Sequence, residues 1–354
     1  MKQTILISLL FLFFWSNGFS QVINSTRLQA FGHVDFETVI TDDTTTSDFG
    51  LGEQELFING KFNDQFSFLG EITLNYSAHG SYRLNLERLR LKFNYYKNHS
   101  LLLGKYHTPV NYWNDVYFHA RLFFPTIDRP AMFKYWIPVH TTGLRFQGQN
   151  IGKYNFGYDV LFGGGMSSED VFELFNENSL TAAVHWKPID GMRVGIAGYM
   201  TSMADASNMA AHSHGDSHGD MHSENPYDGP LDFRMMNASF AYFGDKWEVL
   251  NEFSYNNTNT DTLGQAHSFS NYLYLGRRFK EKNVIYASND IVMADHNDLN
   301  TYEMTFFKYA IGYKFEYSPQ LNVKAQVEYY DNQMGHHDAK ENKFEIKVQL
   351  SYGL

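Results

Sequence analysis

The sequence predicts an all-β protein, a transmembrane antiparallel β-barrel of about sixteen strands with short periplasmic turns and long extracellular loops. Three observations predict it. Aromatic residues make up 17% of the chain, and such a composition favours β structure. Apolar side chains recur at every second residue in segment after segment, which is the period of a strand. The connections alternate between tight turns and longer polar loops, as they do in outer-membrane barrels.

The chain opens on an apolar run from Ile5 to Trp15, followed by small and polar residues up to Ser20. This run is too short to cross a bilayer of about 30 Å as a helix. It fits the central region of a secretory signal peptide. We therefore predict that residues 1–20 are a signal peptide and that residues 21–354 form a barrel in the outer membrane of a Gram-negative cell.

The first predicted strand, residues 27–40, shows the pattern of the others. Leu28 and Phe36 share one face, while His33 and Asp35 share the other. A soluble β-sandwich also alternates, but its strands are usually shorter, and strands of about ten residues or more fit a barrel that is apolar outside and wet inside. The predicted strands are 27–40, 50–62, 66–76, 82–96, 100–106, 137–148, 153–163, 179–187, 192–201, 232–243, 246–256, 268–279, 283–294, 302–317, 320–330 and 343–354.

Short polar sequences such as "ND" at 63–64, "GD" at 244–245 and "SP" at 318–319 predict tight turns on one side of the barrel. With a periplasmic N-terminus, the longer loops fall outside the cell. The last segment keeps apolar residues on one face from Phe344 to Leu354. A final strand that closes the sheet would leave no exposed edge.

The connection at 107–136, "HTPVNYWNDVYFHARLFFPTIDRPAMFKYW", is about 30 residues long and too aromatic for a disordered tail. With its approach "LLLGKYHTPVNYW", the strand count and the loop alternation, the mature chain resembles the sixteen-stranded porins of Gram-negative outer membranes, in particular the phosphate-selective porin family. The resemblance implies that this third loop bends into the barrel and narrows the pore. It also implies a homotrimer.

The segment "ERLRLKF" places Leu89 and Leu91 outward and a ladder of three cations inward. Cations at a constriction favour the passage of anions. The candidate pore-lining residues are Arg88, Arg90, Lys92, Lys105, Arg121, Arg129, Arg145 and Arg193. A similar number of carboxylates is also expected to face inward: Asp35, Glu37, Glu53, Glu55, Glu71, Glu248 and Glu252. The ladder therefore has two interpretations, an anion filter or charges that only solvate the lumen.

The stretch "HSHGDSHGDMHSENP" lies in a predicted extracellular loop, residues 202–231. Imidazoles at such close spacings, with Asp between them, can bind a borderline cation such as Zn²⁺, Cu²⁺ or Ni²⁺. The candidate ligands are His212, His214, His218, His222, Asp216 and Asp220. The alternative is a solvated loop without a ligand. We expect weak, exchangeable binding of metal and no required cofactor.

Several function classes are disfavoured. The chain has no cysteine, which excludes disulfides and thiol chemistry, and its net charge of −11 argues against nucleic acid as a partner. Nucleophile-elbow, H-E-x-x-H and phosphate-loop motifs are missing, so we expect no enzyme. A gated transporter would need a folded plug before the first strand.

We expect a porin in outer-membrane lipid for passive diffusion of small polar solutes, including anions such as phosphate. The alternatives are a metal-capturing barrel that uses the His-rich loop and a structural or adhesive barrel.

Overall fold

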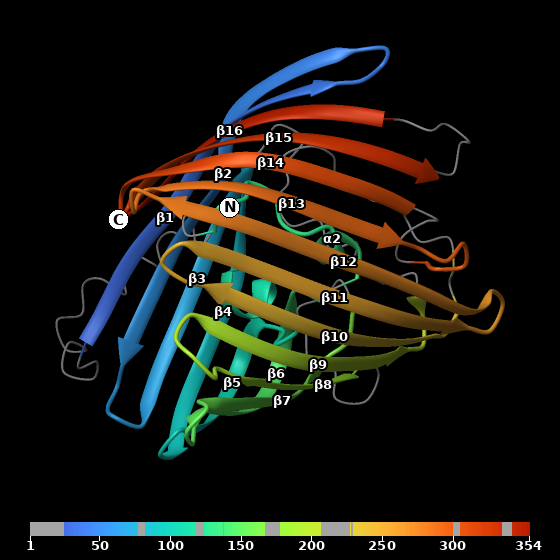
Figure 1. Cartoon of the computed structure of the whole chain (residues 1–354). Coiled ribbons are helices and arrows are strands. Elements are labelled where there is room, and N and C mark those ends of the chain that lie inside the picture. Colours follow the sequence, from blue (N-terminus) through green and yellow to red (C-terminus); the bar gives the residue numbers. More distant parts are fainter. Residues whose placement is uncertain are drawn as a thin grey trace, which may run out of the picture.

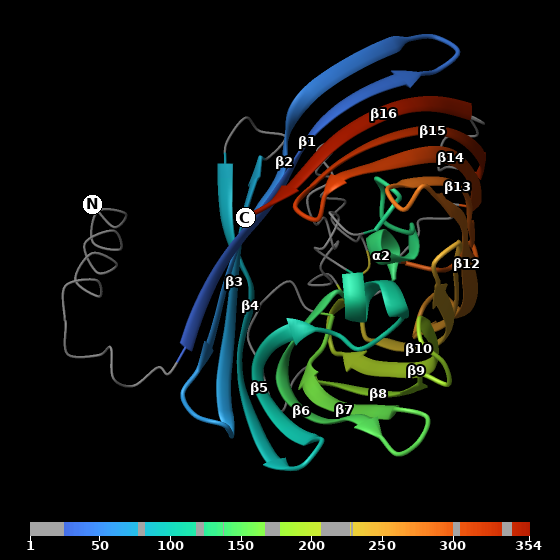
Figure 2. The same ribbon diagram turned by 60° about the vertical axis from the view of Figure 1, so that its left-hand side comes forward.

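The computed structural model describes residues 25–76, 82–117, 124–136, 138–166, 178–206, 227, 229–299, 305–334 and 342–354. Within these ranges, sixteen antiparallel strands close into one barrel (Figures 1 and 2). The strands are β1 (Ser25–Ile40), β2 (Thr45–Lys61), β3 (Phe66–Tyr76), β4 (Tyr82–Tyr96), β5 (His99–His107), β6 (His140–Ile151), β7 (Phe156–Gly164), β8 (Asn178–Trp186), β9 (Met192–Met203), β10 (Leu231–Phe243), β11 (Trp247–Thr260), β12 (Gly264–Phe279), β13 (Asn283–Met293), β14 (Thr305–Ser318), β15 (Leu321–Met334) and β16 (Asn342–Gly353).

Each strand pairs with its neighbours in the sequence, and β1 pairs with β16 to close the sheet. The closing register runs from Phe31 opposite Gly353 to Ile40 opposite Phe344. The predicted fold class is confirmed, because the described sheet is all-β, antiparallel and closed by its last strand. No helix in the described ranges has the length and apolar character needed to cross a membrane.

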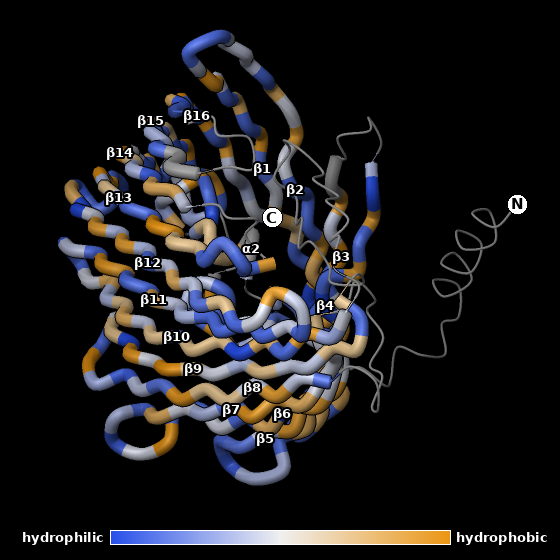
Figure 3. Tube along the Cα trace, turned by 90° about the vertical axis from the view of Figure 1, so that its right-hand side faces the viewer, coloured by the Kyte–Doolittle hydropathy of each residue, from blue (hydrophilic) through white to orange (hydrophobic). Residues whose placement is uncertain are grey.

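The outer surface of the barrel is apolar, as a lipid-facing barrel requires. On β14, Tyr309, Ile311 and Tyr313 are exposed, and the exposed fraction of Ile311 is 67%. Lys308 and Lys314 on the same strand are buried inside. The tube in Figure 3 shows this alternation of apolar and polar residues along the strands.

Strand β4 contains a bulge that the predicted uniform alternation missed. Leu84 and Leu86 are exposed in its first half, whereas Leu89 and Leu91 are exposed in its second half. The change from even to odd positions takes place at Glu87, where the register with β3 shifts. A bulge inserts one extra residue and so changes which residues face outward. Glu87 is thereby buried together with the inner face.

The described parts of the connection between β5 and β6, residues 108–117, 124–136, 138 and 139, enter the barrel, and we call this connection the inner loop. It contains a single π-helical turn, η1 (Trp113–Tyr117), and a short helix, α2 (Met132–Tyr135). Both helices lie inside the ring of strands in Figure 2. Aromatic and methionine side chains of the loop, such as Trp113 and Trp136, are fully buried.

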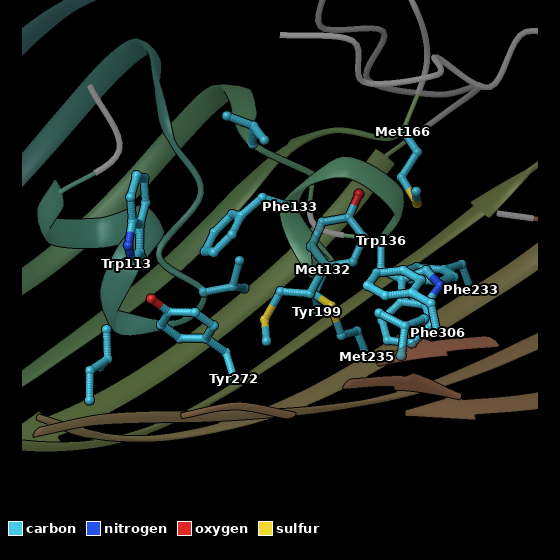
Figure 4. Close-up of a cluster of buried hydrophobic side chains, with 14 of the residues drawn as sticks. Trp113, Met132, Phe133, Trp136, Met166, Tyr199, Phe233, Met235, Tyr272 and Phe306 are labelled. Atoms are coloured by element: carbon cyan, nitrogen blue, oxygen red, sulfur yellow. The ribbon is translucent and has the colours of Figure 1, made fainter. Parts of the chain in front are cut away.

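The buried loop side chains pack against an apolar part of the inner wall (Figure 4). This wall extends from β9 to β14 and includes Tyr199, Phe233, Met235, Tyr272 and Phe306. The prediction of a wet interior is therefore wrong for this side of the barrel, because the inner loop covers it.

Candidate functional site

Carboxylates of the barrel wall hold the inner loop by its backbone. The amide of Trp113 donates to Glu252 Oε1 at 2.8 Å, and the amide of Ala131 donates to Asp290 Oδ2 at 2.6 Å. The two bonds fix the backbone of the loop at two points, one near each of its helical turns. Two of the strands that form the apolar wall, β11 and β13, therefore also fix the position of the loop.

Ion pairs join the loop to strands on several sides of the barrel. Asp115 of η1 lies 2.6 Å from Arg193 Nη2 and 3.4 Å from Arg145 Nη2. Arg129 of the loop contacts both carboxylate oxygens of Glu53 at 2.8 Å. Burial raises the pKa of the Asp115 carboxyl, but the guanidinium groups of Arg193 and Arg145 outweigh it and hold this pKa below its usual value.

A second loop carboxylate, Asp128, joins an acidic cluster with Glu328 of β15 and Glu345 of β16. Oxygens of the three carboxylates lie within 4.8 Å of one another, a spacing that can hold a metal ion. However, the ammonium of Lys347 lies 2.8 Å from Asp128, 3.2 Å from Glu328 and 2.8 Å from Glu345. This lysine supplies the positive charge of the cluster, so we interpret the cluster as an anchor of the loop and not as a metal centre.

The same cluster sets the charge state of Asp128. Burial raises the pKa of the Asp128 carboxyl, while the ammonium groups of Lys347 and Lys308 lower it. The lowering prevails, and this pKa lies well below its ordinary value. Both acidic anchors of the inner loop therefore stay ionised at neutral pH.

Four of the predicted pore-lining cations form ion pairs with carboxylates. Arg88 on β4 pairs with Glu71 on the neighbouring β3. Arg145 also contacts Asp159 on β7 at 2.8 Å, in addition to its contact with Asp115. The other two are Arg129 and Arg193, through the contacts described above. Pairing with a carboxylate therefore neutralises four of the eight predicted cations.

Arg90 and Lys92 differ from these four residues. Within the described part of the chain, neither of them forms a hydrogen bond or an ion pair with a carboxylate. The charges that act most strongly on Arg90 are those of Arg88 and Arg145, both positive, and the more weakly acting carboxylates of Asp115 and Glu71 oppose them. Lys92 is acted on by Arg90 and Arg145. The ladder on β4 is therefore a local excess of positive charge.

Tyr106 lies beside this excess of charge. Its side chain is fully buried, and the guanidinium carbon of Arg145 lies 5.9 Å from the centre of its ring. Among the described residues, its hydroxyl has no hydrogen-bond partner. A buried hydroxyl of this kind normally bonds to water or a ligand. Sequence reasoning missed Tyr106, because nothing in the alternation of β5 separates it from an ordinary core tyrosine.

The remaining predicted site residues are placed differently or fall outside the described ranges. Lys105 lies opposite the exposed Leu89 in the register between β4 and β5. Its ammonium group donates a hydrogen bond of 2.9 Å to the Leu86 carbonyl. Arg121 and the predicted metal ligands His212, His214, Asp216, His218, Asp220 and His222 lie outside the described residues, as do residues 1–20.

The barrel is similar in fold to solved outer-membrane proteins. It matches an anion-selective porin from Comamonas acidovorans with a TM-score of 0.66 and 10% identity, over 93% of this chain and 99% of that one. The outer-membrane channel DcaP of Acinetobacter baumannii matches with a TM-score of 0.63 and 12% identity, over 93% and 97% of the two chains. OmpT of Vibrio cholerae in its trimer form matches with a TM-score of 0.60 and 11% identity, over 93% and 100%. No protein-family model and no curated protein sequence matches the chain.

Proposed function

We propose that the protein is an outer-membrane channel for passive diffusion of small polar solutes, and that it favours anions such as phosphate. The observation that carries the proposal is that Arg90 and Lys92 on β4 form no ion pair with a carboxylate in the described part of the chain, whereas most of the other predicted cations are paired. The similarity in fold to an anion-selective porin also supports the proposed preference for anions. No catalytic step is part of the proposal.

The inner loop defines where a solute would pass. Its apolar side is packed against β9 to β14, and its charged residues are tied to β2, β6 and β16. The proposed path of a solute therefore runs along the part of the wall that includes β4. Cations in a narrow, partly dehydrated passage raise the local concentration of anions and lower that of cations. A dianion such as hydrogen phosphate would gain more from this field than a monovalent anion.

Two further parts of the proposal concern the location and assembly of the protein. Export through the signal peptide at residues 1–20 would place the barrel in the outer membrane. A homotrimer is supported by the trimer form of OmpT, which shares the fold. Cross-linking of the protein in native membranes tests the assembly, and a monomer as the only product would contradict it.

Reversal potentials in a salt gradient across a planar bilayer test the selectivity. We expect the double variant Arg90→Gln, Lys92→Gln to shift the reversal potential toward cation preference, because it removes the uncompensated charge. The matched control is Lys246→Gln, Arg277→Gln, which removes the same charge from two exposed residues, one in the turn between β10 and β11 and the other on β12 opposite Trp247. Low salt gives the largest effect, since screening is weakest there. An unchanged reversal potential in the Arg90 and Lys92 variant would refute anion selectivity through this ladder.

A further inference from the structure

Two carboxyl groups on the wall under the inner loop form no ion pair with a cation in the described part of the chain. They belong to Glu252 of β11 and Asp290 of β13, which accept the loop amides of Trp113 and Ala131. Both residues are buried, with exposed fractions of 0% and 1%. The inner loop is therefore held by carboxyl groups that are shielded from water.

The two carboxyl groups belong to one row across the inner wall. Glu252 lies opposite Tyr272 of β12, and Tyr272 in turn lies opposite Asp290. The next residue of the row is Lys308 of β14. Tyr272 is buried on the part of the wall that the inner loop covers (Figure 4). A neutral side chain thus separates the two acids.

The cation that faces Glu252 is paired elsewhere. Arg193 of β9 acts on this carboxyl, but its Nη2 lies 2.6 Å from Asp115 of η1. From β13, the carboxyl of Asp290 opposes the effect of Arg193. An ionised Glu252 would therefore be dehydrated without a cation of its own, and dehydration disfavours the ionised form.

Asp290 is in the same position on its side of the row. Lys308 acts on it, but the ammonium of Lys308 lies 3.4 Å from Glu328 and 3.7 Å from Asp128. Asp128 of the inner loop adds a like charge that acts on Asp290. Among the described residues, Asp290 Oδ1 has no hydrogen-bond partner. A proton would supply the positive charge that this carboxyl lacks.

We propose that Glu252 and Asp290 couple the docking of the inner loop to pH, so that proton uptake holds the loop against the wall and proton release loosens it. In the docked loop the two carboxyls are shielded from water. When the loop moves away from the wall, water reaches them and stabilises their ionised forms. The docked loop therefore binds protons more tightly than the loosened loop. By linkage, the ratio of docked to loosened loops rises as the pH falls, by up to about 10-fold per pH unit for each carboxyl that titrates.

This dependence on pH is opposite in sign to that of Asp115 and Asp128. Those two carboxylates are paired with cations, so protonation weakens their hold on the loop. Glu252 and Asp290 hold the loop better when they are protonated. The inference concerns the position of the loop and does not rest on the proposed selectivity.

Acrylamide quenching of tryptophan fluorescence tests the proposal on the full chain. In the background Trp186→Phe, Trp247→Phe, the tryptophans that remain after residue 20 are Trp113 and Trp136, both buried in the docked loop. We expect quenching to decrease from pH 8 to pH 5, because the falling pH docks the loop. The double variant Glu252→Gln, Asp290→Asn should be quenched weakly at both pH values, since its neutral amides still accept hydrogen bonds from the loop.

Glu248→Gln is the matched control, because Glu248 is a buried carboxylate of the same strand that Arg278 contacts at 2.8 Å. It should keep the dependence of quenching on pH. Circular dichroism confirms that each variant is a β-barrel. If the double variant does not fold, the single variants Glu252→Gln and Asp290→Asn replace it, and each should lose part of the dependence.

Two results would overturn the proposal. The first is quenching that stays constant or increases from pH 8 to pH 5 in the tryptophan background. The second is a double variant, or a pair of single variants, with the same dependence on pH as this background.

Discussion

The guanidinium group of Arg129 contacts both carboxylate oxygens of Glu53 at 2.8 Å and so ties the inner loop to β2. Both side chains are buried. Removing one partner of a buried pair leaves an uncompensated charge and costs about 3–5 kcal/mol. We therefore expect Glu53→Gln to lower the free energy of unfolding in detergent by this amount and to increase single-channel current noise.

The double variant Glu53→Gln, Arg129→Met separates the loss of the ion pair from the cost of leaving the charge of Arg129 without its partner. It removes both charges together, so its free energy of unfolding should lie closer to that of the wild type than the value for Glu53→Gln alone. Equal losses in the single and double variants would show that the charge of Arg129 is not the source of the cost.

Ile311 on β14 is exposed on the outer face of the barrel, near the middle of its strand. An arginine near the bilayer midplane costs about 2–4 kcal/mol, whereas one near the membrane interface costs about 0–1 kcal/mol. We expect Ile311→Arg to lower the free energy of unfolding in lipid vesicles by the larger amount. Ile189→Arg, in the turn between β8 and β9, is the control and should have the smaller effect. Equal costs at the two positions would contradict the lipid-facing assignment.

The acidic anchors of the inner loop predict how stability depends on pH. The pKa values of Asp115 and Asp128 are lowered by their cationic partners in the folded protein. A lowered folded pKa stabilises the fold above the unfolded value of about 3.9 and loses this contribution as the pH falls toward the folded pKa. The free energy of unfolding should therefore change little on account of these two groups between pH 7 and pH 5, and should decrease below about pH 4.

The variant Asp115→Asn checks whether Asp115 contributes to this pH dependence of stability. It should be less stable at pH 7, and its loss of stability between pH 5 and pH 2 should be smaller than that of the wild type. Asp190→Asn, at an exposed turn, should follow the wild-type profile. An identical pH profile in all three proteins would exclude Asp115 as a contributor.

The His-rich stretch at 212–222 predicts weak, exchangeable metal binding. Imidazole binds metal only when neutral, and its ordinary pKa is about 6.5. We expect Zn²⁺ or Cu²⁺ to bind the detergent-solubilised protein at pH 7.5 and to be largely released near pH 5. Deleting residues 212–222 should remove most of the bound metal and leave the barrel folded, as calorimetry and circular dichroism would show. The same stoichiometry with and without the deletion would identify this stretch as a solvated loop.

The strands and their closure could be predicted from the sequence because the alternation of apolar and polar residues indicates which side chains face lipid. Alternation says nothing about what covers the inner face. Strand β10 carried a signal of the inner loop, since Phe233 and Met235 are apolar on the inner side while Met236 and Phe240 are apolar on the outer side. A strand that is apolar on both faces indicates that both are covered.

The candidate site could be predicted only in part. The cations of β4 follow from the pattern of "ERLRLKF", but pairing with carboxylates on the neighbouring strand decides which of them keep their charge. Arg88 and Arg90 look alike in the sequence, and only the position of Glu71 on β3 separates them.

The apolar packing of the inner loop on β9 to β14 has a consequence for how such a chain can change. That side of the barrel resembles the interior of a water-soluble domain, where a substitution alters packing and stability together. Arg90 and Lys92 lie on a strand outside it. Substitutions on β4, where the proposed selectivity lies, therefore leave this packed side unchanged, so the proposed preference for a solute can be altered separately from the packing of the inner loop.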